Sequence, residues 1–362
     1  MMGLILKESA ACHHDRLFLC IGEKKMYYYS NEIVFRGHPD KVCDQISAAI
    51  LKACMEQDQN TRAGIETMGG KGKIFITGEV TTAADIDVKK IAREVLDDVG
   101  YTAEYEIIDN IGKQSADIAL GTNDEIGGAG DQGMMFGYAC DDTERMLPTA
   151  MVMLQEYAAW YDGIRKADGR FLPDGKCQIT GLYEEGLKIQ KVVTWTISYQ
   201  NTEKEREATD KIIVDKAREI AAKYGIEVEK FLVNPTGKFE IGGFDGDAGL
   251  TGRKIVVDAY ESFANVGGGC MNGKDPTKVD FSAAHKAREI ACRYLPGHHW
   301  VEVQLSYAIG KAQPLAIYID TDKGSVEAPQ SLFEECTPAR IIKDLKMKEL
   351  DFVELAKYGH FR

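Results

Sequence analysis

The stretch from Ile241 to Asp280 constrains this chain most, because glycines, lysines and carboxylates are interleaved along it. Nine glycines lie between Gly242 and Asp280, and glycine lets a backbone approach a ligand closely. The charged residues in the same stretch include Asp247, Arg253, Lys254, Lys274, Lys278 and Asp280. Fixed cations neutralise phosphate oxygens, and carboxylates hold magnesium beside them. The combination predicts a polyphosphate site, and the alternative is a pair of ordinary glycine-rich turns around a strand with solvated charges.

Length, charge and cysteine usage limit the class of protein. A chain of 362 residues is long enough for two or three domains. Its formal net charge of −13 argues against a nucleic-acid or anionic-membrane partner, and no apolar run approaches the roughly 20 residues of a membrane span. Nine scattered cysteines without a CxxC pair favour reduced thiols and a cytoplasmic location.

The first 25 residues differ from the rest of the chain. MMGLILKESAACHHDRLFLCIGEKK has a short apolar start that acidic, basic and histidine residues interrupt, which is a poor signal peptide. We expect residues 1–25 to be a disordered extension or a mis-assigned start, with Met26 as the natural first residue.

A second charged segment lies at a predicted strand-to-helix junction. Residues 26–35 read as a strand, and Pro39 suits the first turn of the helix that follows. His38, Asp40 and Lys41 would then lie at a helix N-terminus, which favours anions. A purely structural turn is an equally good interpretation of these three residues.

The remaining pattern alternates strands with amphipathic helices in about three units of similar size. We expect helices near 85–99, 149–161, 207–224 and 277–294, and strands near 73–80, 105–108, 191–199, 300–308 and 315–320. Residues 171–178 are expected to form a turn that presents Asp174 and Lys176. This pattern favours an α+β fold in which helices cover the sheet faces.

A nucleotide-binding P-loop is the main alternative for the organising stretch. GGCMNGKD at 268–275 approaches GxxxxGK, but Asp275 stands where a magnesium-binding hydroxyl should be, and Pro276 follows at once. No hydrophobic strand leads directly into the segment, as a P-loop requires. A dinucleotide site is weaker still, because the stretch contains no GxGxxG.

Several motifs in order resemble the methionine adenosyltransferase (S-adenosylmethionine synthetase) family, in a divergent bacterial-type form. They are GHPDK at 37–41, GAGDQGMMFGYA at 128–139, DAGLTGRK at 247–254, GKDPTKVD at 273–280, SYAIG at 306–310 and YGHF at 358–361. The resemblance runs from about Tyr27 to Arg362. It implies an α+β fold of three similar domains with pseudo-threefold symmetry, whose flat sheets pack at a dimer interface.

The resemblance also implies domain boundaries and partners. We expect an N-terminal domain over 26–117, part of a mobile gating loop over 118–127, a central domain over 128–241 and a C-terminal domain over 242–362, with structural domains interleaved in sequence. Homodimers or homotetramers would carry active sites at the interface between subunits.

The implied reaction makes S-adenosylmethionine from ATP and L-methionine, with two Mg²⁺ ions per site and K⁺ as a further cofactor. Sulfur attacks the 5′ carbon of ATP, and the expelled triphosphate is then hydrolysed. The matching positions are His38, Lys176, Arg253, Lys254, Lys274 and Lys278 as catalytic groups, Asp40 and Asp280 as magnesium ligands, and Glu66 as a potassium ligand. Substrate contacts fall on Glu79, Gln114 and Asp247 for methionine, on Asp131 and Phe239 for adenosine, and on Asp174 beside Lys176.

Some positions depart from the family pattern. Arg36 replaces an acid beside the GHPDK motif, Phe281 replaces an arginine after Asp280, and Asn272 replaces a serine implicated in potassium binding. These changes leave open a divergent paralogue that only hydrolyses tripolyphosphate, or a non-catalytic nucleotide sensor. The intact lysines and acids favour the enzyme, because binding alone does not need so many groups on the leaving phosphates.

Overall fold

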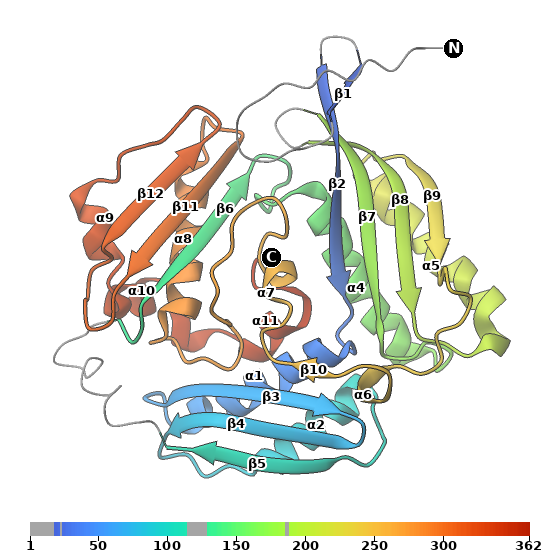
Figure 1. Cartoon of the computed structure of the whole chain (residues 1–362), viewed down its shortest axis with the longest axis horizontal. Coiled ribbons are helices and arrows are strands. Elements are labelled where there is room, and N and C mark those ends of the chain that lie inside the picture. Colours follow the sequence, from blue (N-terminus) through green and yellow to red (C-terminus); the bar gives the residue numbers. More distant parts are fainter. Residues whose placement is uncertain (1–17, 22–23, 114–128, 185–187) are drawn as a thin grey trace.

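The computed structural model describes residues 18–21, 24–113, 129–184 and 188–362. Three open β-sheets stand around a central group of helices, and the C-terminus lies in the middle of the molecule (Figure 1). The predicted α+β class is therefore confirmed, and the three sheets agree with a pseudo-threefold arrangement.

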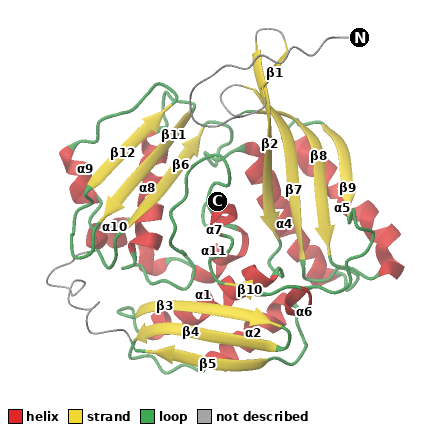
Figure 2. Cartoon of the chain, viewed as in Figure 1, coloured by secondary structure: helices red, strands yellow, loops and turns green. Residues whose placement is uncertain are grey.

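The first sheet has the order β1-β2-β7-β8-β9 and is antiparallel except for the parallel β8–β9 pair. Its strands are β1 (Phe18–Ile21), β2 (Lys24–Val34), β7 (Gly175–Glu184), β8 (Ile189–Tyr199) and β9 (Val228–Val233). Two helices, α4 (Thr149–Ala167) and α5 (Arg206–Lys223), pack against it (Figure 2). The turn expected at 171–178 is wrong for residues 175–178, because they belong to β7, which has ten residues and begins at Gly175.

The second sheet has the order β10-β3-β4-β5. Its strands are β3 (Arg62–Gly70), β4 (Lys73–Thr81), β5 (Glu106–Gly112) and the two-residue β10 (Gly249–Leu250). Helices α1 (Pro39–Gln57) and α2 (Val88–Val99) pack against it. Pro39 stands in the first turn of α1 as predicted, and Gly100 ends α2 with φ +100°, a conformation that glycine adopts readily.

The third sheet has the order β12-β11-β6, with both pairs antiparallel. Its strands are β6 (Gly133–Cys140), β11 (Trp300–Tyr307) and β12 (Ala316–Thr321), and α8 (Val279–Tyr294) packs against it. The shorter elements are η1 (Glu203–Glu205), α6 (Gly243–Gly246), α7 (Ile255–Asp258), α9 (Gln330–Glu335), α10 (Pro338–Asp344), η2 (Met347–Glu349) and α11 (Phe352–Tyr358).

Each sheet combines segments that are far apart in the sequence. Strand β2 pairs with β7, β6 pairs with β11, and β10 pairs with β3. The domain boundaries expected from the resemblance stay a prediction. At the N-terminus, Phe18–Ile21 pairs with Lys24–Tyr27 as a hairpin, so part of the expected extension is an edge strand of the first sheet.

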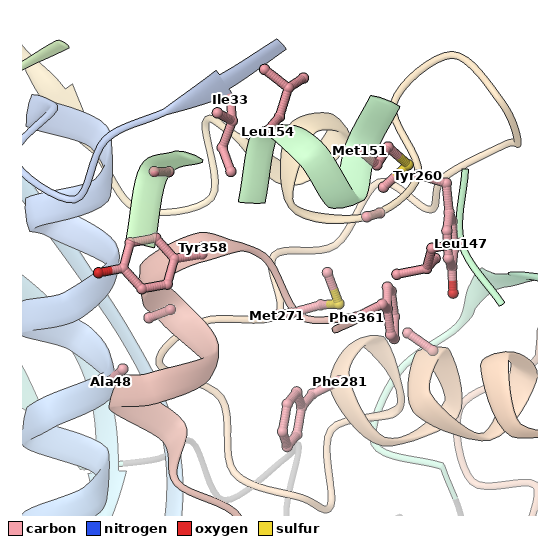
Figure 3. Packing of buried hydrophobic residues seen from close by; sticks show 14 of the residues in the cluster. Ile33, Ala48, Leu147, Met151, Leu154, Tyr260, Met271, Phe281, Tyr358 and Phe361 are labelled. Carbon is pink, nitrogen blue, oxygen red and sulfur yellow. The ribbon is translucent and has the colours of Figure 1, made fainter. Parts of the chain in front are cut away.

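The hydrophobic core continues into the space between the three sheets. Figure 3 shows Ala48 of α1, Met151 and Leu154 of α4, Phe281 of α8 and Tyr358 of α11 around this centre. Phe361, next to the end of the chain, stacks on Tyr260 with ring centroids 4.8 Å apart. The chain end is thus a packed part of the core.

Candidate active site

The N-terminus of α1 presents the first charged group of the site. His38 is the N-cap residue, and its Nδ1 accepts a hydrogen bond of 3.2 Å from the backbone N–H of Asp40. An acceptor Nδ1 leaves the ring hydrogen of a neutral imidazole on Nε2. Burial, with smaller contributions from Lys254 and Lys176, lowers the pKa of His38 to about 4, so His38 is neutral at pH 7.

Asp40 is held by groups from the glycine-rich stretch. Its carboxylate is fully buried and accepts a hydrogen bond of 2.9 Å from the backbone N–H of Leu250. Arg253 Nε lies 2.8 Å from Oδ1, and Lys254 Nζ donates to Oδ2. Burial alone would raise the pKa of Asp40, but the hydrogen bonds from Lys254 and from the backbone of Leu250 outweigh it and hold the pKa below its ordinary value. The carboxylate is therefore ionised beside two cations.

A pocket of about 240 Å³ opens beside this carboxylate. It is lined by His38, Pro39, Asp174, Gly175, Lys176, Ser198, Phe239, Ile241, Gly246 and Asp247. Five of these residues are among the site residues expected from the sequence. Together with Asp40, Arg253 and Lys254 they form what we call cluster one.

Asp174 links the pocket wall to the glycine-rich stretch. Its buried carboxylate accepts a hydrogen bond of 2.7 Å from the backbone N–H of Gly243. Burial raises the pKa of Asp174 to about 6. Gly242 must be small here, because a Cβ would lie 2.6 Å from the side chain of Gln200 and 2.9 Å from Asp174. These contacts fix the loop that carries Ile241 over the pocket.

A second group of expected residues, cluster two, surrounds the start of α8. Lys274 Nζ donates to Asp280 Oδ2 at 2.5 Å, and Lys278 is the N-cap residue of α8. A Cβ on Gly269 would lie 2.0 Å from the carboxylate carbon of Asp280, so glycine lets the loop backbone lie against this group. Gly133, two residues after Asp131, also lies near Asp280.

Strand β3 connects the two clusters. Met68 pairs with Leu250, whose backbone N–H binds Asp40 of cluster one, and Gly64 forms an isolated bridge with Lys274 of cluster two. Four residues of strand correspond to about 13 Å. Glu66 lies between these points on the exposed side of β3, and Glu79 is opposite Gly64 on β4. Gln114, by contrast, lies outside the described residues.

Asp275 explains why the segment is not a P-loop. One carboxylate oxygen accepts a hydrogen bond of 2.8 Å from the backbone N–H of Ala63, and the other accepts from Thr277 at 2.9 Å. The side chain clamps the loop onto β3, which leaves Lys274 and Lys278 to face a ligand. Sequence reasoning missed this structural role.

Two further expectations change in the structure. Lys41 does not face the site: it is buried and binds Asp258 at 2.5 Å. Arg36 also turns away from His38, and it binds Asp98 at 2.6 Å and Asp162 at 3.2 Å. Its positive charge is thus neutralised locally, and Arg36 does not line the pocket.

The donors of the two clusters fit magnesium bound together with phosphate. No group of three or more histidine, cysteine or acidic side chains suited to a metal ion occurs within the described residues. Magnesium is usually bound by one or two carboxylates plus substrate phosphates and water. Asp40 and Asp280 each supply one carboxylate beside cations that can contact phosphate, so the residues fit that mode.

Asn272 is already engaged within the protein. Its side-chain oxygen lies 2.9 Å from Nε2 of His360, and the side chain also favours the ionised form of Asp258. An ion at the neighbouring loop would therefore need other oxygen donors, such as Glu66.

Comparison with protein families agrees with these motifs. The models for the N-terminal, central and C-terminal domains of S-adenosylmethionine synthetase match residues 26–118, 126–239 and 241–362, respectively. Across the part of the chain that the structure covers, no helix is both long and apolar enough to span a membrane. With three domain models in order over nearly the whole chain, and with their characteristic lysines and carboxylates gathered in two clusters, the chain belongs to the S-adenosylmethionine synthetase family, which makes S-adenosylmethionine from ATP and methionine.

Proposed function

We propose that clusters one and two together perform the adenosyl transfer and the hydrolysis of the bound triphosphate to pyrophosphate and phosphate. The observation that carries this proposal is the buried Asp40 carboxylate with Arg253 and Lys254 on its two oxygens. Such an arrangement suits a ligand with several negative charges and a bound divalent cation.

The chemical step needs alignment and charge stabilisation rather than a base. A sulfur lone pair of methionine forms the bond to C5′ of ATP, the C5′–O bond breaks, and its electron pair remains on the triphosphate. Thioether sulfur carries no proton, so no group has to remove one. Catalysis then depends on holding the reactants in line and on stabilising the departing oxygen.

The proposed site residues fall into groups that bind the triphosphate, the adenosine and methionine. His38 donates from Nε2 toward the oxygen that leaves C5′, while Lys176, Arg253, Lys254, Lys274 and Lys278 bind the triphosphate. Phe239, Asp131 and Asp174 line the adenosine side, and Glu79, Gln114 and Asp247 bind methionine.

Metal ions complete this scheme. Asp40 and Asp280 would each hold one Mg²⁺, which when bound neutralises phosphate charge as a Lewis acid. A K⁺ ion would bind near Glu66, and the side chain of Asn272 would not be one of its ligands. Seven of the cysteines, from Cys43 to Cys336, are unpaired, which suits a reducing compartment and supports a cytoplasmic location.

We further propose that one active site takes cluster one from one subunit and cluster two from its partner in a homodimer or homotetramer. Large apolar side chains support such an interface, because Met68, Met134 and Tyr318 on the sheets are at least 50% exposed. The separation of the clusters along β3 agrees with a site that is divided between subunits.

Mixing two inactive variants tests this assignment. Alone, His38→Ala disables cluster one and Lys274→Met disables cluster two. If subunits assemble at random, half of the dimers contain one subunit of each variant. Each of these mixed dimers has one intact site of two, so co-expression should restore about a quarter of wild-type S-adenosylmethionine synthesis.

The matched control is His38→Ala mixed with Asp40→Asn, because both changes affect cluster one and no intact site can form. If activity recovers in neither mixture, the proposal of a site shared between subunits is wrong. Product analysis completes the experiment: pyrophosphate and phosphate should appear in equal amounts with the sulfonium product.

A further inference from the structure

Directly behind the site, four polar side chains meet in the interior of the molecule. We call Lys41, Asp258, Asn272 and His360 the buried junction. Each is at most 5% exposed. They come from α1, from α7, from the loop before α8 and from the end of the chain. Four separate segments are therefore joined at one place.

The junction is a continuous chain of hydrogen bonds. Lys41 Nζ donates to Asp258 at 2.5 Å, and it also contacts Asp44 at 3.0 Å and the carbonyl of Ala356 at 3.1 Å. The neighbouring Asn272 side chain favours the ionised form of Asp258. An amide oxygen only accepts, so Nε2 of His360 donates to Asn272 at 2.9 Å. The backbone N–H of His360 donates to the carbonyl of Asp258 at 2.9 Å.

Three segments that carry proposed phosphate or metal groups have a junction residue close in sequence. Lys41 directly follows Asp40. The backbone N–H of Asp258 donates to the carbonyl of Lys254 at 2.8 Å, and Asn272 lies two residues before Lys274. The relative positions of Asp40, Lys254 and Lys274 therefore depend on this shared network.

Stability alone is a weak reason for this network. Burying charged and polar groups is costly even when they are paired, and apolar residues of similar size are often as stable. A buried hydrogen-bond network does, however, define one arrangement of the segments that enter it, and among the described residues only Nδ1 of the His360 ring is left without a partner in this junction. This matters at a site where a displacement of about 1 Å can reduce the rate 10²-fold.

We infer that the buried junction fixes the segments that carry clusters one and two relative to the rest of their own subunit, so that each cluster is correctly placed in the shared site it enters, and that His360 and Asn272 are positioning residues for the reaction. The inference rests on the proposed roles of Asp40, Lys254 and Lys274. His360 acts from the end of the chain through Asn272, and neither residue touches the substrates.

A neighbouring histidine provides a matched control. His285 is half-buried whereas His360 is 4% exposed, and the two ring centroids are 5.8 Å apart. Within the described part of the chain, however, Nε2 of His285 has no hydrogen-bond partner. Replacing either ring by methionine changes the packing similarly, but only His360→Met removes a bond to the loop of Lys274.

Steady-state kinetics of the full-length variants tests the inference. We expect His360→Met to lower kcat about 10- to 100-fold with KM for methionine within about twofold. His285→Met should keep kcat within about twofold. His360→Gln, which retains a side-chain N–H donor, should recover most of the lost kcat, and Asn272→Ala should reproduce the loss.

Equal kcat losses in His360→Met and His285→Met, or no rescue by His360→Gln, would overturn the positioning role. If His360→Met fails to fold, Asn272→Ala decides, and wild-type kcat in that variant overturns the inference. Lys274→Met separates the two proposals, because wild-type turnover in that variant would contradict the assigned role of Lys274 itself.

Discussion

Asp40 and Lys41 are consecutive in the chain, yet they enter two different sets of ion pairs. Asp40 faces Arg253 and Lys254 at the pocket, whereas Lys41 faces Asp258 and Asp44 in the interior. The pocket cations keep access to solvent, with side chains 46% and 19% exposed. The Lys41 side chain is 1% exposed.

This difference shows how the same lysine–carboxylate chemistry can serve two purposes. At the pocket, a ligand can replace one partner of a pair, because water and phosphate can reach it. In the interior no ligand can, so the pairs connect segments of the fold. Burial alone would lower the pKa of Lys41, but Asp258 and Asp44 outweigh it and raise the pKa.

The largest expected effect comes from breaking the interior set. Lys41→Met leaves Asp258 and Asp44 buried without their cation, and removal of one partner of a buried pair typically costs about 3–5 kcal/mol. Denaturant unfolding should show this loss. Lys52→Met on the same helix is the matched control, because Lys52 binds Asp351 at the surface and should cost less than about 1 kcal/mol. Equal losses would contradict the distinction.

Breaking the pocket set should affect the rate instead of the fold. Lys274→Met removes a cation from the leaving triphosphate, so kcat/KM should fall about 10²- to 10³-fold. The free energy of unfolding should change by less than about 1 kcal/mol. Lys216→Met is a control of similar exposure, paired with Glu219 on α5, and it should keep wild-type kinetics. Turnover near wild type in Lys274→Met would refute the assigned role.

The pH dependence of the unfolding free energy tests whether a buried interior group titrates differently from an exposed one. Burial lowers the pKa of His285 to about 4, so the unfolded chain binds a proton there at higher pH than the folded chain does. Stability from this group is complete above the unfolded pKa of about 6.5 and is lost as pH falls toward 4. The loss is up to about 3 kcal/mol, at about 1.4 kcal/mol per pKa unit.

His285→Phe should flatten this part of the pH dependence. After subtraction of their difference at pH 8, the unfolding free energies of the wild type and the variant should diverge as the pH falls below about 6.5, with the wild type becoming the less stable. Parallel curves between pH 8 and 4 would show that His285 does not titrate with the lowered pKa.

The smallest effect is expected for an exposed pair on the molecular surface. Lys211 binds Asp215 one turn along α5, with side chains 78% and 48% exposed. Such pairs contribute about 0.3–0.5 kcal/mol. Lys211→Ala should therefore shift the unfolding free energy by no more than that amount, and the shift should shrink in high salt. A loss above 1 kcal/mol would contradict the ranking by burial.

Local features of the sequence predicted many of the elements. Pro39 begins α1 as expected, and the helices expected near 85–99 and 277–294 are α2 and α8. No strand was predicted for β7. Its first residues, which include the polar Lys176 and Gln178, were assigned to a turn. The motif segments also predicted which loops carry charge, and five expected residues line one pocket.

Pairings between distant segments could not be predicted in this way. Nothing near Asp40 in the sequence indicates that Lys254 binds its carboxylate, and nothing near Asn272 indicates His360. Lys41 looked like a ligand group because it follows GHPD, whereas the first turn of α1 directs it inward. Asp275 likewise looked like a defective P-loop residue until the structure showed it bound to β3.

The sequence by itself determined the α+β class, the family and the inventory of charged groups, because glycine, proline and periodic apolar residues act locally and motifs are read in order. The tertiary structure decided which charges face a ligand and which lie in the interior. The physical reason is that solvent access depends on packing between segments up to 315 residues apart, as with Lys41 and the carbonyl of Ala356. That access determines whether a lysine–carboxylate pair is open to a ligand or is part of the fold.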